Sequence, residues 1–394
     1  MEIDLKIKNH LEKVNLDIRK TKNGRFMDQK VTPNNLSFIA ECVVNLDIDD
    51  NEFTVKTIWD YDYFLKNTVA IYNKPSPKNE SAKHEYDKFI QQPLKMLSAA
   101  EVLSCEKRGT TNYYKLLNKE ILFYISIKER NAFIFMYHYL VKVLKDSEIF
   151  SYFETFRLKQ DKDSFKTLKE RFIRFIIGNT PINTSVEVRR IFPKILNVFS
   201  AYNSVKGTTG GRISKNIFYF SDLTYNSINF RDKKKDKTLT RTEALTLDSQ
   251  KINKKAYGRY LVDKAKKLIS TKYIFSEVKD KYADGPAIHV HHIFPQSSFP
   301  KLAYYLENLI KLTATQHLYH AHNKGNTHEI NKDYQCVCLI AKSESIETSV
   351  SQGDFFYSKN DFIYVLNVGL DSDINSSLDF DDIRLEINKI YNEA

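Results

Sequence analysis

The chain has 394 residues, of which 42% are hydrophobic and 13% aromatic, so it can bury sizeable cores and is not a disordered protein. Its 60 Lys and Arg against 49 Asp and Glu leave a net charge of +11, which favours polyanionic partners such as nucleic acid. The four cysteines lack the spacing of a disulfide framework, and neither an apolar signal core nor a run of about 18 apolar residues occurs. We therefore predict a soluble cytoplasmic protein that makes no contact with a membrane.

Residues 1–78 are predicted to form the N-terminal part of the chain. A helix should begin after Pro33, because apolar side chains recur along one helical face from Leu36 to Val44. Trp59 and the tyrosines beside it can stack on a base, but such residues more often belong to a core, and we assign them there.

Residues 79–160 show the order helix, hairpin, helix. An amphipathic helix over 85–97 is followed by a hairpin with a basic glycine turn at 107–111 and by a helix from Lys119. This order is similar to that of a winged-helix DNA-binding domain, and the alternative is a helical domain with a surface hairpin. The side chains expected to contact DNA are Lys107 and Arg108 of the turn and Gln92 and Lys95 of the helix.

Residues 161–203 are predicted to be a helical connector, with helices over 165–177 and 186–199. From residue 204 to residue 394 we predict a further domain with a C-terminal helical extension. Its first segment should contain a flexible glycine-rich loop at 207–214 and a strand over 218–223.

A basic run precedes the histidine-rich segment described below. It contains Lys233, Lys234 and Lys235, and a helix over 254–269 adds further lysines, Lys266 among them. Clustered cations can hold a phosphodiester backbone, and the other interpretation is a solvated charged surface. Towards the C-terminus we predict a helix or strand over 334–341, a helix cap at Ser358 and a last helix that ends at Tyr391.

Six of the 10 histidines fall between His289 and His322. Residues 287–293 alternate in polarity and are rich in β-branched side chains, which predicts a short strand. Successive side chains of a strand point to opposite faces, so His289 and His291 should share one face and His292 the other.

A second strand is expected over 309–312, followed by a helix over 313–323 that is capped by Thr313 or Thr315. One imidazole from the first strand and one from this helix can meet over a divalent ion, while the adjacent histidine stays available for proton transfer. The alternative is a histidine-rich surface hairpin, or core histidines that bond to backbone carbonyls.

This strand, strand and helix segment resembles the HNH, or ββα-metal, nuclease motif. The resemblance implies that His291 is a metal ligand and His292 the general base. It implies that Asn308 orients this base and that His317, nine residues after Asn308, is the second ligand. The family often adds a structural zinc held by paired Cys-x-x-Cys motifs, which this chain lacks there, so we expect no structural zinc.

Some members of the family carry another histidine one helical turn after the second ligand. Residue 321 is Ala here, with His320 and His322 on either side. On an α-helix His320 shares the face of His317 and His322 does not. We expect a phosphate contact, before a metal role, from one of the two, and we take His322 as a DNA contact.

The whole chain resembles a group of HNH type II restriction endonucleases in which a DNA-recognition part with a winged helix precedes the HNH domain. The resemblance rests on residues 24–33, 73–79, 85–89 and 291–295. It implies that residues 1–78 are a DNA-recognition part and that residues 204–394 form the HNH nuclease domain with its helical extension. It implies an α+β protein that cuts DNA site-specifically, outside an asymmetric target as type IIS enzymes do. It also implies one divalent ion per active site, with Mg²⁺ as the first candidate and Mn²⁺, Co²⁺ or Ni²⁺ accepted.

The expected partner is double-stranded DNA. A single site of this kind cuts one strand, so a double-strand break requires a transient homodimer or two successive nicks. A DNA methyltransferase is expected as a genetic partner without a stable complex. The alternatives are a modification-dependent or nicking HNH endonuclease, and a DNA-binding regulator whose histidines bind metal structurally.

Overall fold

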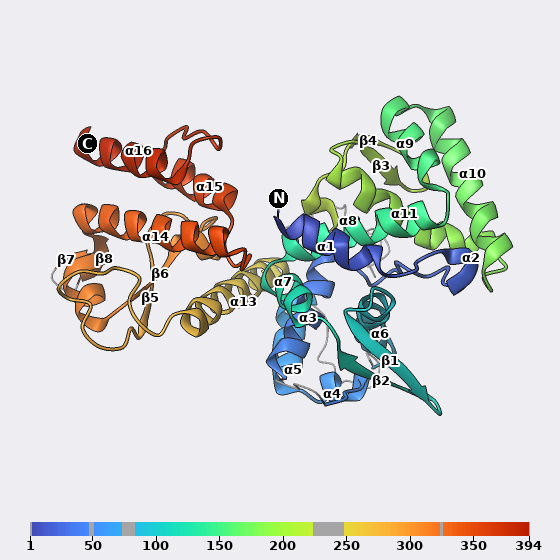
Figure 1. Ribbon diagram of the computed structural model, residues 1–394, viewed down its shortest axis with the longest axis horizontal. Helices are drawn as coiled ribbons and strands as arrows, with labels where there is room; N and C mark the ends of the chain where they lie inside the picture. Colours follow the sequence, from blue (N-terminus) through green and yellow to red (C-terminus); the bar gives the residue numbers. More distant parts are fainter. Residues whose placement is uncertain (1, 47–50, 73–82, 224–247, 324–325, 394) are drawn as a thin grey trace. The chain divides into compact units, whose positions relative to one another are not determined.

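The computed structural model describes residues 2–46, 51–72, 83–223, 248–323 and 326–393 (Figure 1). Over these residues the protein is mainly helical and adds four two-stranded antiparallel sheets, which confirms the predicted α+β class. The chain divides into two compact units, residues 1–245 and 246–394. The first unit thus continues beyond residue 204, where we predicted the nuclease domain to begin. No described helix is both long and apolar enough to cross a membrane.

The first unit consists of helices and two hairpins. Its described elements are α1 (Glu2–Glu12), α2 (Ile18–Thr21), α3 (Pro33–Asn45), α4 (Val55–Trp59), α5 (Asp62–Tyr72), α6 (Lys83–Ala99), β1 (Leu103–Arg108), β2 (Thr111–Leu116), α7 (Lys119–Ile127), α8 (Glu129–Asp146), α9 (Phe150–Lys159), α10 (Lys162–Asn179), α11 (Ser185–Tyr202), β3 (Lys206–Thr209), β4 (Arg212–Ile217) and the 3₁₀ turn η2 (Phe220–Leu223).

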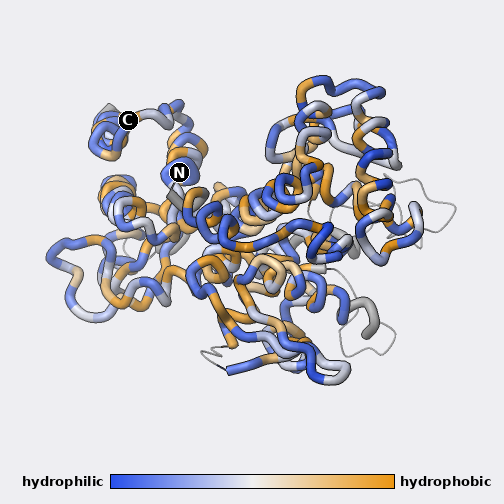
Figure 2. Tube along the Cα trace, turned by 45° about the vertical axis from the view of Figure 1, so that its right-hand side comes forward, coloured by the Kyte–Doolittle hydropathy of each residue, from blue (hydrophilic) through white to orange (hydrophobic). Residues whose placement is uncertain are grey.

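Helix α8 is central to this unit and packs against α1, α3, α7, α9 and α11. Stretches of high and low hydropathy alternate along the helices, as in amphipathic helices that bury one face (Figure 2). A cluster of aromatic rings joins α9, α10 and α11: the centroid of Phe153 lies 6.2 Å from Phe172 and 5.6 Å from Phe199. Such rings bury large apolar areas and hold the helices together.

The sequence predicted the order α6, β1, β2, α7 correctly. The hairpin turns at Gly109, whose φ of +61° lies in the left-handed region that glycine adopts without strain. Phe53 adds a third backbone segment to the hairpin, because its N–H and C=O both bond to Tyr114 across an antiparallel bridge. The two aromatic side chains are buried, with centroids 5.7 Å apart.

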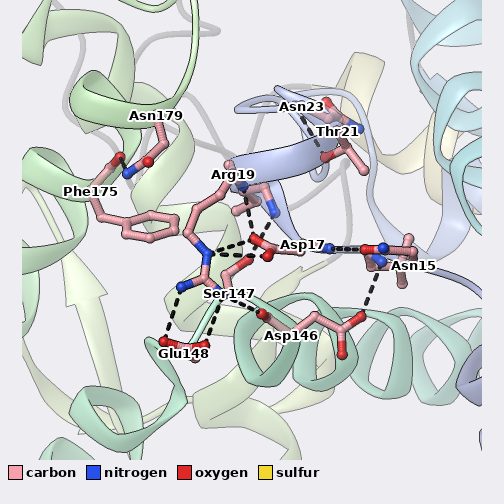
Figure 3. Close-up of polar contacts among 12 residues, drawn as sticks. Asn15, Asp17, Arg19, Thr21, Asn23, Asp146, Ser147, Glu148, Phe175 and Asn179 are labelled. Atoms are coloured by element: carbon pink, nitrogen blue, oxygen red, sulfur yellow. Dashed lines mark hydrogen bonds and ion pairs between the residues drawn. The ribbon is translucent and has the colours of Figure 1, made fainter.

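Charged side chains fasten the N-terminal segment to the end of α8 (Figure 3). The guanidinium of Arg19 donates to Asp17 at 3.0 Å and to Glu148 at 3.0 Å. The hydroxyl of Ser147 accepts from the backbone N–H of Ile18, which starts α2. These bonds hold α2 against the turn that follows α8.

Two predictions for residues 204–223 were wrong. The expected flexible loop forms the hairpin β3–β4, because Gly210 and Gly211 both adopt positive φ and close a two-residue turn. The amide of Asn197 in α11 exchanges two hydrogen bonds with the backbone of Thr208, which fixes the hairpin on that helix. Residues 220–223, predicted as part of a strand, form the 3₁₀ turn η2, in which Asp222 accepts from the N–H of Tyr219. The basic run of Lys233, Lys234 and Lys235 lies outside the described residues.

The second unit is built around a short β-hairpin and four helices in the part that the structure describes. Its elements are α13 (Asp248–Lys272), β5 (His289–His292), the 3₁₀ turn η3 (Leu306–Asn308), β6 (Leu309–Leu312), the π-turn η4 (Gln316–Ala321), β7 (His322–Asn323), β8 (Asn326–Ile330), α14 (Lys332–Gln352), α15 (Lys359–Leu370) and α16 (Phe380–Glu393). Helix α13 packs on β5 and β6, and α14 packs on η4, α15 and α16.

Strands β5 and β6 pair antiparallel, with His291 opposite Ile310 and His292 opposite Leu309. This confirms the two predicted strands. The helix predicted over 313–323 is shorter than expected: it widens into a π-turn and ends at Ala321, and His322 begins β7. Ser358 caps α15, as predicted, by accepting from the N–H of Asp361.

Candidate functional site

Strand β5 presents its histidines on two faces. The ring of His289 stacks on that of His317 with centroids 4.5 Å apart, and His291 meets His317 edge to face at 5.2 Å. His292 lies on the other face, where its Nε2 is 3.0 Å from the carbonyl oxygen of Ala303. The alternation predicted from the strand is therefore confirmed.

The π-turn brings the imidazole of His322 close to those of His291 and His317. Residues five apart become neighbours in a turn with i→i+5 hydrogen bonds, and His317 and His322 have this spacing. The ring centroid of His322 lies 4.9 Å from that of His317 and 5.0 Å from that of His291. One nitrogen from each of the three rings lies within 4.8 Å of the other two. We call His291, His317 and His322 the histidine triad.

We expected His320, and not His322, to share the face of His317, because we assumed the 3.6-residue period of an α-helix. The structure shows the reverse. His320 turns away from the triad and stacks on Tyr282 with centroids 3.8 Å apart. His322 is buried beside His291 and His317, where it is better placed as a third metal ligand than as the predicted phosphate contact.

Burial keeps His291 and His317 in their neutral form. His291 is 5% exposed, and burial lowers its pKa well below the usual value, with His317 and His322 as further causes. Burial, together with His289 and His322, lowers the pKa of His317 to about 4. A neutral imidazole retains the lone pair that binds a metal ion, so His291 and His317 are available to a metal at neutral pH.

One nitrogen of the triad lacks a partner. Among the described residues, the buried Nδ1 of His317 makes no hydrogen bond. Such an atom costs free energy unless a ligand compensates it. Three imidazole donors leave a fourth tetrahedral position open, which is the composition of a catalytic rather than a structural zinc-type site. The residues present therefore fit a divalent transition metal ion.

Gln316 fixes the start of the π-turn, and the sequence analysis missed it. Its side chain is fully buried: Oε1 accepts from Ser276 Oγ at 2.6 Å, and Nε2 donates to Val278 O and Asp280 Oδ1 at 2.9 and 2.8 Å. Gln316 and Thr313 also bond reciprocally, each side chain to the other's backbone N–H. Thr313 is thus the predicted cap, and Thr-x-x-Gln is the capping-box signal by which Gln316 could have been found.

Asn308 was expected to orient His292, and in the structure its hydrogen bonds go to the loop beside that histidine. The buried amide of Asn308 donates to the carbonyls of Phe294 and Leu302 and accepts from Phe294 N–H. Ala303, whose carbonyl bonds to His292, directly follows Leu302. Asn308 therefore braces the loop that holds His292, and among the described residues the two side chains share no hydrogen bond.

The hydrogen bond to Ala303 selects one tautomer of His292. A carbonyl oxygen only accepts, so Nε2 must carry the proton and Nδ1 keeps a free lone pair. Burial lowers the pKa of His292, while the bond to Ala303 raises it and Lys266 lowers it. The ring is thus neutral and basic at Nδ1 in neutral solution.

The predicted DNA contacts of the hairpin lie in the first unit. Lys107 is exposed near the tip of the hairpin. Arg108 forms salt bridges with Glu52 at 2.7 Å and with Glu106 at 2.5 Å, and it lies over the ring of Tyr113. Its guanidinium thus has acidic partners within the protein, which a phosphate would have to displace.

Of the two DNA contacts predicted on α6, one side chain is exposed and the other bonds within the protein. Lys95 is exposed. Gln92 accepts a hydrogen bond of 2.7 Å from the backbone N–H of Lys30, so it braces the N-terminal segment. Trp59, which we assigned to the core, is half-buried and lines a cavity of about 530 Å³ together with Gln91 and Asn112.

The chain was compared with models of protein families, with curated proteins and with solved structures, and none of them matches it.

Proposed function

We propose that this protein is a metal-dependent endonuclease that hydrolyses DNA phosphodiester bonds at an HNH-type site in its C-terminal unit. The observation that carries the proposal is that two adjacent histidines of β5, His291 and His292, lie on opposite faces and suit different roles. His291 belongs to a triad suited to a metal, and His292 faces the opposite side with a basic nitrogen. Metal ligand and general base are the two components that hydrolysis of a phosphodiester requires from the protein.

His292 is the general base of the proposed reaction. Its Nδ1 takes a proton from a water molecule, which then attacks phosphorus in line with the leaving oxygen. The carbonyl of Ala303 keeps the ring in the correct tautomer and orientation throughout. Asn308 is a positioning residue, because it fixes the loop that presents this carbonyl.

The triad would hold the metal ion. Bound there, a divalent ion would supply Lewis-acid stabilisation of the phosphate group. We predicted Mg²⁺ as the first candidate, but Mg²⁺ prefers oxygen ligands. Three imidazoles favour softer ions, so with His322 as a third ligand we now place Mn²⁺, Co²⁺, Ni²⁺ and Zn²⁺ before Mg²⁺.

The first unit would recognise DNA. Support for a winged helix comes from α6, the β1–β2 hairpin and the bridge from Phe53, which together give a helix followed by a small three-segment sheet. Exposed Lys95 and Lys107 offer contacts to the DNA backbone. With recognition and cutting in separate units, cleavage outside the target is expected, which makes a type IIS restriction enzyme our proposal for the biological role.

The test is digestion of unmethylated phage DNA by the full chain in the presence of Mn²⁺, Co²⁺, Ni²⁺, Zn²⁺ or Mg²⁺, followed by sequencing of the ends. Discrete fragments with a fixed distance between site and cut support the proposal. His292→Ala should lower the cleavage rate about 10²- to 10⁴-fold, because it removes the general base. His320→Ala is the matched control, since His320 stacks on Tyr282 away from the triad, and it should cut as the wild type does.

Three results would contradict parts of this proposal. Cutting by His292→Ala at the wild-type rate would exclude the mechanism. Specific binding of DNA with no cutting under any of the five ions would favour the regulator. Cutting only of modified DNA would make the enzyme modification-dependent.

A further inference from the structure

A cavity in the first unit lies between α4, α6 and the β1–β2 hairpin, which are neighbours in the fold (Figure 1). Its volume of about 530 Å³ is that of a pocket for a small organic group. Phe53, directly before the cap of α4, bridges to Tyr114 in β2, so α4 is joined to the hairpin. The walls of the cavity are therefore fixed by the fold of this unit.

Trp59, the only tryptophan of the chain, provides the aromatic wall of the cavity. It lies on α4, which begins at a capping box: Thr54 and Thr57 each bond through the side chain to the other's backbone N–H. The indole is half-buried and packs against the ring of Phe64, with centroids 6.4 Å apart. An aromatic ring held in this way at a cavity offers a surface on which another flat ring can stack.

Helix α6 contributes two polar side chains that have no partner within the protein. Asp87 and Gln91 both line the cavity, and their spacing of four residues places them on one face of the helix. Both are half-buried, and among the described residues neither side chain makes a hydrogen bond or a salt bridge. The next residue, Gln92, differs because it accepts from the backbone N–H of Lys30. Asp87 and Gln91 are thus available to bond with a ligand.

The charges around the cavity favour one kind of ligand. The lining residues include the carboxylates of Asp60 and Asp87 and the ammonium of Lys56, which leave one net negative charge in a chain of net charge +11. This local charge disfavours a phosphate group and favours a group that donates N–H. A nucleobase with an amino group combines such donors with a flat ring. Carboxylates accept from the amino group of cytosine, and glutamine amides pair with adenine.

We propose that the cavity binds one nucleobase of DNA that is unpaired or turned out of the double helix, and that it prefers a base with an amino group. The base stacks on Trp59, its amino group donates to Asp87, and Gln91 pairs with the remaining polar edge. Exposed Lys107 belongs to the hairpin whose turn also lines the cavity, so it can contact the adjoining DNA backbone. The inference rests on the proposed DNA recognition by the first unit.

Tryptophan fluorescence of the full chain tests the inference, because Trp59 is its only source. The protein is titrated with three duplexes of one sequence: one is fully paired, and the others carry a single adenine or a single thymine opposite an abasic position. An unpaired base enters a pocket at lower cost than a paired one. We expect unpaired adenine to quench the fluorescence and to bind about 10-fold more tightly than unpaired thymine, which lacks the amino group.

Two matched variants separate the cavity from general electrostatics. Asp87→Ala should lower the affinity for unpaired adenine about 10-fold relative to that for thymine, so that the preference is lost. Asp163→Ala removes an exposed carboxylate from α10, in the same unit but outside the cavity. It changes the net charge equally and should keep the preference. Equal preference in Asp87→Ala and wild type would overturn the inference.

Fluorescence anisotropy of a labelled duplex, measured in parallel, distinguishes the remaining outcomes. Binding of all three duplexes without any change in Trp59 fluorescence would overturn the inference and uphold DNA recognition. No binding of any duplex would contradict both. Quenching with a preference for adenine, in a protein that cuts no DNA with any of the five ions, would uphold the cavity and refute the nuclease function.

Discussion

The C-terminal unit buries two clusters of ionisable side chains, and they are built on opposite principles. In the first, the carboxylate of Glu277 accepts from Lys342 at 2.7 Å and from the backbone N–H of Lys311 at 2.9 Å. Lys342 also donates to the hydroxyl of Tyr357, and the side chains of Glu277 and Lys342 are fully buried. The second cluster is the histidine triad, in which three groups that can only gain positive charge face one another.

The difference shows which cluster serves stability and which serves a ligand. Glu277 and Lys342 satisfy each other, and they join β6 to α14. The triad contains a buried nitrogen of His317 without a partner among the described residues, and burial lowers the pKa values of His291 and His317. A buried imidazole nitrogen without a partner has its lone pair available to an ion from solution.

Removal of one partner of the buried pair Glu277 and Lys342 should cause the largest loss of stability. Lys342→Met leaves the carboxylate of Glu277 buried beside apolar atoms, which typically costs about 3–5 kcal/mol of the free energy of unfolding. Glu277→Gln should cost a similar amount, because it strands the ammonium. Urea denaturation followed by circular dichroism measures both.

The double variant Glu277→Gln with Lys342→Met sharpens the comparison. It removes both charges, so its loss in the free energy of unfolding should be clearly smaller than the sum of the losses in the two single variants. Simple additivity would contradict the conclusion that the two residues stabilise the unit as a pair.

Replacement of Asn308 should cost less stability than replacement of Lys342, and it should also lower activity. Asn308→Ala removes three buried hydrogen bonds from the loop that carries Ala303, for a loss of about 1–3 kcal/mol. Because Asn308 positions His292 only through this loop, cleavage should fall less than it does in His292→Ala. Parallel measurements of melting temperature and kcat decide this. An equal loss of kcat in both variants, at wild-type stability, would place Asn308 in direct contact with the reacting groups.

The sequence predicted those parts of the site that depend on local pattern. Alternation along β5 placed His291 and His292 on opposite faces, and the order of strands followed from apolar runs between turns. Likewise Gly109 marked the first hairpin, and the cap at Ser358 marked α15. In each case the residue's own backbone preference agrees with the tertiary structure.

Other parts depend on contacts between distant residues. The π-turn at 316–321 begins at Gln316, whose side chain bonds to Val278 and Asp280, more than thirty residues earlier in the chain. The sequence analysis assumed a regular α-helix there, so it assigned His322 to the wrong face. The pair of Glu277 and Lys342 likewise joins segments whose sequence patterns contain no sign of each other.

The smallest predicted effect concerns the pH dependence of stability that His291, His292 and His317 cause in the metal-free protein. The folded-state pKa values of His291, His292 and His317 are lowered, whereas in the unfolded chain they are near 6.5. As the pH falls through this value the unfolded chain binds protons that the folded chain does not, so stability is lost with falling pH. The carboxylates of Asp280 and Asp354, with lowered pKa values, titrate well below this range and do not obscure it.

Between pH 7 and pH 6 we expect a loss of roughly 1 kcal/mol, after discounting the half-exposed His317 for solvent screening. This corresponds to a fall of about 2–4 °C in the melting temperature. His317→Gln should make the fall shallower, because one titrating group is gone. Saturating Co²⁺ should raise the melting temperature at pH 7 and make it more dependent on pH, since protons compete with the ion for the same nitrogens. A melting temperature that rises from pH 7 to pH 6 in the metal-free protein would show that the triad is protonated in the folded state, and the contrast with the satisfied pair would then fail.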